Sequence, residues 1–176
     1  MPLNKKKLLR WGCELSLLVL IVGAVITWQS KDMLSADGSS TVPEARLVSL
    51  SGEVLPLAER GKRTLIYFWA PWCQICALSI GSLQNIEQQD LHVVTVAMDY
   101  DSVESVAAFV AEHDVQNTVL LGTQAIKQDL QILGYPSYYL VNEQRKIVAK
   151  SYGLNTSVGI KMNNWLAQLR ESAEKP

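Results

Sequence analysis

The chain has 176 residues, which gives room for one globular domain and a short additional segment. Apolar residues make up 48% of it and the formal net charge is −1, so a core can form and no basic surface marks a nucleic-acid-binding protein. Basic residues nevertheless cluster before residue 11, at Lys5, Lys6, Lys7 and Arg10, and the sequence from Lys31 onward is mildly acidic.

The first predicted element is a membrane-spanning helix from Trp11 to Trp28. A helix of this length spans about 27 Å, close to the roughly 30 Å of a bilayer's hydrocarbon core. Tryptophans at both ends suit the membrane interfaces, and the basic cluster before the segment predicts a cytoplasmic N-terminus. We therefore expect residues 1–30 to be an uncleaved signal anchor that contacts the lipid bilayer through residues 11–28.

A cleaved signal peptide is the main alternative to this anchor. The apolar stretch is short, but the residues that follow it, Thr27 to Lys31, form a poor cleavage site. A buried helix of a soluble protein is a second alternative. Cys13 lies before the apolar run, and the sequence assigns it no role.

A polar segment at residues 31–44 is rich in serine and glycine, which is typical of a linker. We expect the globular domain to occupy residues 45–176, where strand and helix patterns alternate. The expected strands are a hairpin at 47–57, buried strands at 64–70 and 91–98, a short strand at 118–121 and an antiparallel pair at 137–141 and 146–151. The expected helices lie at 73–88, 102–112, 124–133 and 156–170.

The last of these helices carries its apolar side chains on one stripe, formed by Val158, Met162, Trp165, Leu166 and Leu169. Helices between strands predict parallel neighbours in the sheet, and the final hairpin adds antiparallel strands. The predicted fold class is therefore α/β, with a mixed central sheet flanked by helices and an N-terminal transmembrane helix before it.

The strongest functional signal is the motif Trp72-Cys73-Gln74-Ile75-Cys76, which follows the buried strand 64–70. Its two sulfurs lie one helical turn apart. Cys73 falls at the start of the predicted helix, where unpaired N–H groups and the helix dipole favour negative charge. Such surroundings lower the pKa of a cysteine thiol, and the thiolate is the nucleophile of disulfide exchange. We therefore predict that Cys73 attacks and that Cys76 resolves the mixed disulfide.

Other uses of the two cysteines fit less well. A zinc site would need further ligands, but no second CxxC is present, and His92 and His113 lack ligand spacing. Covalent haem attachment would need a histidine after the second cysteine, where this chain has Ala77. Two inert buried thiols remain an alternative. We predict no metal and no organic cofactor.

A second motif, Gly134-Tyr135-Pro136-Ser137, precedes the strand 137–141. Proline cannot donate to a sheet ladder, so Pro136 belongs at a strand start, where a cis bond would present the backbone of Tyr135 beside the two sulfurs. An extended substrate could pair with that backbone as an added strand. By itself, however, Gly-x-Pro is also a common turn.

With these motifs the sequence resembles the thioredoxin superfamily. It is similar in particular to the TlpA-like, membrane-anchored thiol–disulfide interchange branch, which includes the suppressor-of-copper-sensitivity D type and the cytochrome c maturation thioredoxins. The resemblance runs from about Val42 to Leu169, and its motifs are TLIYFWAPWCQIC, LHVVTVAMD, LGYPSYYLVN and KIVAKSYG. It implies a redox-active Cys73–Cys76 disulfide, a cis Pro136 with Tyr135 beside it, and a Trp72 that helps form the substrate-facing surface.

The chain departs from this family at three positions. Thioredoxins proper carry a buried acid where this chain has Tyr67, and many cytochrome-maturation relatives carry glutamate where it has Ser79. Gly81 replaces the helix-kinking proline of many relatives. The missing carboxylates argue against efficient thioredoxin-like reduction and weaken the link to cytochrome c maturation.

The sequence therefore predicts a protein disulfide oxidoreductase, single-pass in a bacterial inner membrane, with a periplasmic catalytic domain. It would exchange disulfides with extracytoplasmic protein substrates and with a membrane redox partner that supplies or accepts electrons. The sequence does not fix the direction of electron flow. Two alternatives stay open: a copper-handling metallochaperone that uses the two thiolates as soft ligands, and a redox-inactive adaptor that binds partners through the groove at Pro136.

Overall fold

The computed structural model describes residues 11, 12, 14, 16, 17, 20, 21, 23–25, 28, 30–86 and 91–173. The chain divides into two units, Met1–Lys31 and Asp32–Pro176. In the first unit, the described residues from 11 to 28 are helical and their large apolar side chains are exposed. Within the described residues, no helix is both long and apolar enough to cross a bilayer. The predicted span falls partly outside those residues, as does Cys13.

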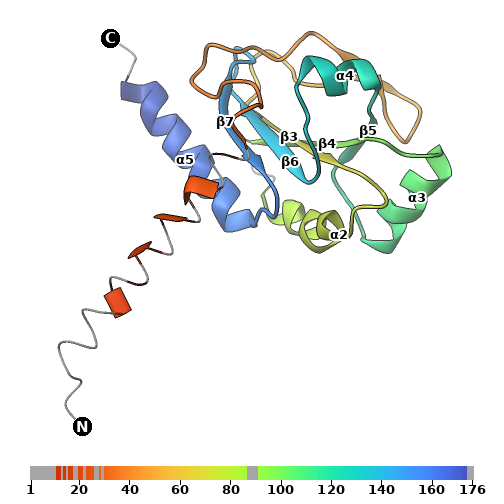
Figure 1. Cartoon of the computed structure of the whole chain (residues 1–176). Helices are drawn as coiled ribbons and strands as arrows, with labels where there is room; N and C mark the ends of the chain where they lie inside the picture. Colours follow the sequence, from red (N-terminus) through yellow and green to blue (C-terminus); the bar gives the residue numbers. More distant parts are fainter. Residues whose placement is uncertain are drawn as a thin grey trace. The chain divides into compact units, whose positions relative to one another are not determined.

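A mixed sheet forms the centre of the second unit (Figure 1). Among the described residues it has five strands, in the order β5-β4-β3-β6-β7. β3 (Thr64–Trp69) pairs in parallel with β4 (His92–Ala97), which pairs in parallel with β5 (Thr118–Leu121). On its other side, β3 pairs antiparallel with β6 (Ser137–Val141), which pairs antiparallel with β7 (Ile147–Tyr152). The predicted mixed sheet is confirmed.

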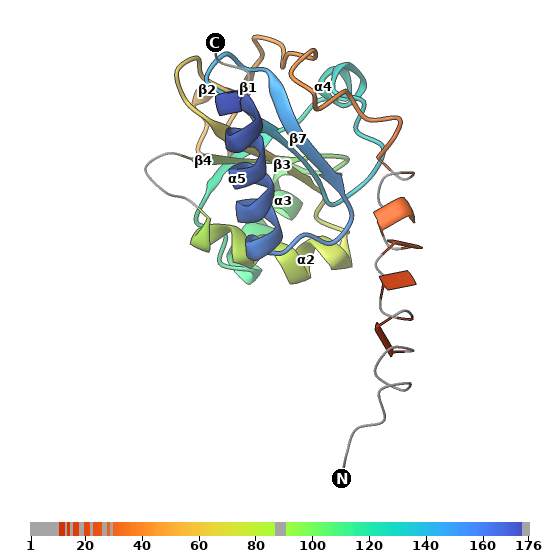
Figure 2. The ribbon, with the colours of Figure 1, turned by 90° about the vertical axis from the view of Figure 1, so that its left-hand side faces the viewer.

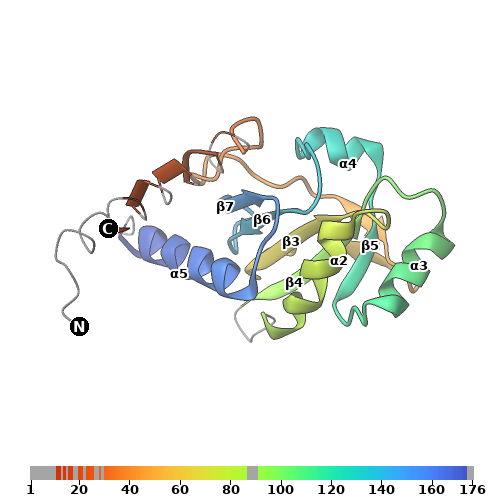
Figure 3. The ribbon, with the colours of Figure 1, turned by 60° about the horizontal axis from the view of Figure 1, so that its bottom comes forward.

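Helices cover both faces of this sheet. They are α2 (Gln74–Ile80), α3 (Val103–Glu112), α4 (Gln124–Asp129) and α5 (Ser157–Ala173). Figure 3 shows α2, α3 and α5 on one face and α4 on the other, and each face has its own apolar core. Because both faces are covered, all residues of the central strand β3 are buried and most of them are apolar, although Thr64 and Tyr67 carry hydroxyl groups.

Local sequence explains where these helices begin and end. α3 begins after Ser102, its N-cap, whose hydroxyl accepts a hydrogen bond from the Ser105 N–H at 3.2 Å. α4 ends at Asp129 and does not reach Leu133 as the periodicity predicts. Gln131 has a φ of 49°, a left-handed backbone conformation that an α-helix cannot contain.

A separate hairpin lies before β3. β1 (Arg46–Val48) and β2 (Val54–Pro56) pair antiparallel, with the turn where the sequence predicts it. A single bridge between Ser49 and Leu120 ties the hairpin to β5 at the edge of the main sheet. The hairpin therefore continues the packed domain rather than extending away from it.

The residues before the hairpin also pack on the domain. Met33 and Val42 are buried, although they belong to segment 31–44, which the sequence predicts to be a linker. The Lys150 side chain donates a hydrogen bond to the Met33 carbonyl oxygen at 3.0 Å. Backbone hydrogen bonds, such as that from the Val42 N–H to the Arg145 carbonyl oxygen at 2.9 Å, add to these contacts, and the packed unit begins at Asp32.

α5 lies along one face of the sheet, as Figure 2 shows, but it does not bury its apolar stripe. The five side chains of the stripe are between 41% and 73% exposed. The residues that α5 buries are Ile160 and Ala167, on the opposite side of the helix. An amphipathic helix ordinarily turns such a stripe to the core, so its orientation here needs a separate explanation.

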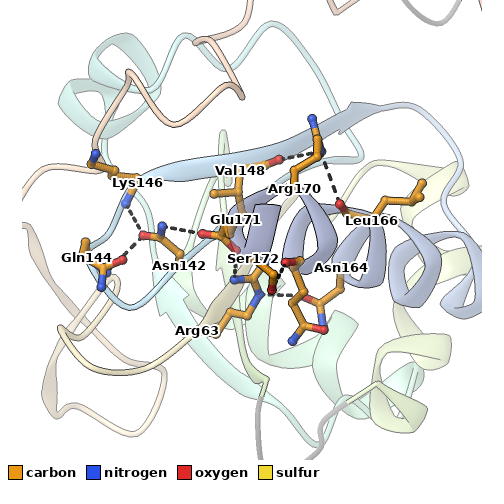
Figure 4. Close-up of polar contacts among 11 residues, drawn as sticks. Arg63, Asn142, Gln144, Lys146, Val148, Asn164, Leu166, Arg170, Glu171 and Ser172 are labelled. Carbon is orange, nitrogen blue, oxygen red and sulfur yellow. Dashed lines mark hydrogen bonds and ion pairs between the residues drawn. The ribbon is translucent and has the colours of Figure 1, made fainter. Parts of the chain in front are cut away.

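Polar contacts supply that explanation (Figure 4). The Glu171 carboxylate accepts hydrogen bonds from Arg63 and Asn142, each at 2.6 Å, and Arg63 Nε donates to the Asn164 side chain at 2.6 Å. The Arg63 side chain is only 3% exposed, so its bonds to Asn164 and Glu171 are partly buried and charge-assisted. Asn163 adds a bond to the Tyr138 hydroxyl at 2.6 Å. The inner face of α5 is therefore held mainly by polar groups.

Candidate active site

Cys73 and Cys76 lie at the junction of β3 and α2, and a disulfide joins them. Cys73 is the N-cap of α2, and the Cys76 N–H points at its sulfur, with N and S 3.2 Å apart. The helix predicted over 73–88 is shorter than expected, since α2 gives way to a 3-10 turn, η1 (Gly81–Asn85). Residues 87–90 of that prediction lie outside the described part of the chain.

The two cysteines are not equally accessible. Cys73 keeps 7% of its surface exposed, whereas Cys76 keeps none. Disulfide exchange requires that the attacking thiolate reach the sulfur, so an external thiol meets Cys73 first. This is the order of access that an attacking Cys73 and a resolving Cys76 require.

A neutral hydrogen-bonded pair lies one turn after Cys76. Tyr67 is fully buried in β3, and its hydroxyl lies 2.7 Å from Ser79 Oγ. Ser79 uses its own proton on the carbonyl oxygens of Ile75 and Cys76, so Tyr67 is the donor in the pair. Burial raises the pKa of Tyr67 to about 12, against a smaller lowering by the bond to Ser79. The two positions at which relatives carry acids are therefore neutral here.

The loop before β6 lies beside the cysteine loop. Phe68 near the end of β3 pairs with Ser137 at the start of β6, so the residues just before Ser137 lie at the same end of the sheet as the disulfide. The Tyr135–Pro136 peptide bond is cis. The Trp72 and Tyr135 rings meet edge to face with their centroids 5.8 Å apart. Trp72, Tyr135 and Pro136 thus come together around the loop of Cys73.

Asp99 joins this group, and the sequence reasoning missed it. It follows β4, and its carbonyl oxygen accepts a hydrogen bond from Trp72 Nε1 at 2.8 Å. Its carboxylate accepts one from the Tyr135 hydroxyl at 2.9 Å. A signal for it was available: β3 and β4 are parallel neighbours, so an acid just after β4 must lie beside the loop that follows β3.

A hollow of about 580 Å³ lies elsewhere on the second unit. Its walls are residues 36–38, the turn between β6 and β7, the last turns of α5 with Glu171, and Arg63, which precedes β3 (Figure 4). It contains none of the residues around the disulfide. Among the described residues, no group of three or more His, Cys, Asp or Glu is arranged to hold a metal ion.

Comparison with known proteins places this geometry in a family. Residues 37–164 match the Redoxin family, which is more than half of the chain. The thioredoxin-like protein YneN of Bacillus subtilis is 27% identical over 139 residues, which are 73% of this chain and 81% of YneN. The thiol-disulfide oxidoreductase ResA of Oceanobacillus iheyensis is 27% identical over 157 residues, which are 82% of each chain.

Solved structures give the fold. The thioredoxin domain of a thiol-disulfide oxidoreductase from Bacteroides vulgatus matches with a TM-score of 0.64 and 20% sequence identity, over 75% of this chain and 98% of that domain. The fold is therefore thioredoxin-like, with a mixed sheet flanked by helices.

Proposed function

The chain belongs to the Redoxin family, and from this premise we propose that it is a thiol–disulfide oxidoreductase that exchanges disulfides with extracytoplasmic protein substrates. The observation that carries the proposal is the Cys73–Cys76 disulfide at the head of α2, with its accessible sulfur on Cys73. Relatives named as thiol-disulfide oxidoreductases support it.

The proposed reaction needs only the two sulfurs. A substrate thiolate attacks Cys73, the Cys73–Cys76 bond breaks, and the electron pair leaves on Cys76 as its thiolate. A second substrate thiolate then attacks the substrate sulfur of this mixed disulfide, and Cys73 leaves as a thiolate. The substrate becomes a disulfide and the protein a dithiol. In the reverse direction Cys73 attacks a substrate disulfide and Cys76 resolves the intermediate.

The substrate would bind at the surface formed by Trp72, Tyr135 and Pro136. An extended peptide that pairs with the backbone of Tyr135 brings its own cysteine toward Cys73. Trp72 is 63% exposed, so its ring can pack on such a peptide without any change in the core.

We further propose that residues 1–30 anchor this domain in a bacterial inner membrane, with residues 11–28 in the bilayer and the catalytic domain on the periplasmic side. The support is the sequence pattern of an apolar segment between tryptophans after a basic cluster. A domain placed there would need a membrane redox partner to supply or accept electrons. We expect the full-length protein to stay in the membrane fraction after alkaline carbonate extraction, and we expect a protease added to the periplasm to digest its catalytic domain.

Trapping of the mixed disulfide tests the enzymatic proposal. In the full-length Cys76→Ala variant, the intermediate on Cys73 cannot be resolved. We expect mixed disulfides with substrate proteins, visible on non-reducing gels and abolished by reductant. The double variant Cys73→Ala/Cys76→Ala is the matched control and should show none. A folded, membrane-bound Cys76→Ala protein without Cys73-dependent adducts would contradict the proposal, and a redox titration gives the direction of electron flow.

A further inference from the structure

Asp99 contacts three segments of the proposed substrate-facing surface. Besides the Trp72 and Tyr135 bonds, its carboxylate accepts hydrogen bonds from two side chains of α4. Gln124 Nε2 donates to Oδ1 at 2.9 Å, and Lys127 forms an ion pair with Oδ2. The Lys127 ammonium also lies 5.5 Å above the Tyr135 ring. One residue therefore ties together the cysteine loop, the loop before Pro136 and the start of α4.

The backbone of Asp99 makes these contacts possible. Its φ is 44°, in the left-handed region, which aspartate and asparagine tolerate better than most residues. In this conformation, the carbonyl bonds to Trp72 while the side chain bonds to Tyr135. An aspartate here thus holds both rings from a single backbone position.

Core packing does not fix the Trp72 ring, which is 63% exposed. Tyr135 is partly buried and packs against both apolar cores, which order its ring only in part. Without a partner, exposed aromatic side chains occupy several rotamers, and binding must then order them at a cost in affinity. The bonds to Asp99 hold both rings in one edge-to-face arrangement before a substrate arrives.

Asp99 is poorly suited to be a proton acceptor for the cysteines. Its carboxylate oxygens already accept bonds from Tyr135, Gln124 and Lys127. Burial raises the pKa of Asp99, but the hydrogen bonds from Lys127, Tyr135 and Gln124 outweigh it and hold the pKa below its usual value. A weak base that already accepts three hydrogen bonds has a structural role toward its neighbours.

We propose that Asp99 is a positioning residue that preorganises Trp72 and Tyr135 for binding of protein substrates. The inference rests on the proposed function and adds to it the group that shapes the substrate surface. It makes a distinction that the function alone does not: loss of Asp99 should weaken reaction with proteins, which use this surface, far more than reaction with a small disulfide, which needs only Cys73.

Two substitutions separate the side chain from the backbone. Asp99→Asn keeps the size and the left-handed backbone preference but removes the charge that holds Lys127. Asp99→Gly keeps the backbone conformation and the carbonyl bonded to Trp72 but removes every side-chain bond. Asp114→Asn is the matched control, because Asp114 also has a positive φ, 47°, in the turn after α3 and makes no contact with Trp72 or Tyr135.

The measurement is the second-order rate constant of the prereduced, full-length protein with insulin disulfides and with oxidised glutathione. For insulin we expect a loss of about tenfold in Asp99→Asn and more in Asp99→Gly, the size that a lost charge-assisted hydrogen bond produces. For glutathione we expect all variants to stay within about twofold of the wild type. The Asp114→Asn rates should match the wild type with both reagents.

A double-variant test supports the assignment independently. Tyr135→Phe removes only the hydroxyl that bonds to Asp99, so it should lower the insulin rate, and adding it to Asp99→Asn should cost less than the sum of the two effects. Equal losses with insulin and glutathione, or unchanged insulin rates in folded variants, would overturn the inference. A wild-type protein inert to both reagents would instead reject the proposed function itself.

Discussion

At the scale of single residues, Tyr67 and Ser79 set the environment of the inner cysteine. A buried carboxylate at either position would repel a thiolate on Cys76 and would exchange protons with it. The neutral Tyr67–Ser79 pair does neither, because the pKa of Tyr67, raised to about 12, keeps its hydroxyl protonated at neutral pH. We therefore expect the redox equilibrium of the pair Cys73–Cys76 to lack the pH dependence that a titrating buried acid adds.

The same burial predicts a stability change at high pH. The pKa of Tyr67 and that of Tyr139 are raised from 10.0 to about 12, in both cases mainly by burial. A group whose pKa is higher in the folded than in the unfolded state contributes stability that is complete below the unfolded value and is lost as pH rises through the folded value. The free energy of unfolding should therefore fall between pH 10 and 12, by about 2–3 kcal/mol for each of these tyrosines.

Urea unfolding at several alkaline pH values measures this loss. Burial also raises the pKa of Tyr135 and that of Tyr138, so the loss has several contributors. Tyr67→Phe lacks one of these titrating groups, so its curve of stability against pH should be flatter than that of the wild type. Equal slopes in wild type and Tyr67→Phe would show that burial of Tyr67 does not control its titration.

At the scale of elements, continuous apolar runs were the most informative part of the sequence. β3 and β4 follow from such runs because a strand covered on both faces buries nearly all of its side chains, and most of these are therefore apolar. The cysteine motif and Pro136 could be identified from the sequence because each is interpreted from the residues next to it in the chain. Asp99 was missed because its partners, Trp72 and Tyr135, become neighbours only when the sheet is assembled.

α5 shows a second reason why sequence patterns mislead. Its apolar stripe predicts a buried face, but Glu171 and Asn164 find partners inside the domain, at Arg63. Periodicity records which side chains share a face. It does not record that a buried arginine such as Arg63 offers partners to the polar face of the helix.

The orientation of α5 predicts opposite results for two substitutions of apolar residues. Ile160 is 1% exposed, so Ile160→Ala should lower the free energy of unfolding by about 2–4 kcal/mol. Trp165 is 56% exposed, so Trp165→Gln should change it by less than about 1 kcal/mol despite the much larger side chain. Chemical denaturation of both variants measures the difference. A large loss for Trp165→Gln with a small one for Ile160→Ala would mean that the helix presents its other face to the core.

At the scale of the whole molecule, β3 separates two regions of different character. Arg63 precedes the strand and makes the polar contacts with α5, whereas Cys73 follows it at the other end, roughly 20 Å away for a strand of this length. The contacts that hold α5 are thus distant from the disulfide. Changes at the Arg63 end should alter stability without altering the chemistry of the cysteines.

The segment before the hairpin packs on the domain, and its removal should lower the free energy of unfolding. Met33 and Val42 are buried, and the Leu34 N–H donates a hydrogen bond to the Tyr139 hydroxyl at 2.9 Å. A chain shortened to begin at Ala45 loses these contacts. We expect it to be less stable than a chain that begins at Asp32 by about 3 kcal/mol, the lower end of what burial of two apolar side chains contributes at roughly 1.5–3 kcal/mol each.

Urea midpoints of the two shortened chains measure this difference. The double variant Met33→Ala/Val42→Ala, in the chain that begins at Asp32, is the control and should reproduce most of the loss. Equal midpoints for the two shortened chains would mean that residues 32–44 act only as a linker. Because the segment packs on the core beside α4 and Cys73 lies on the opposite face, the glutathione rate of the folded shortened protein should stay within about twofold of the longer one. Stability and redox chemistry would then be separable in one domain.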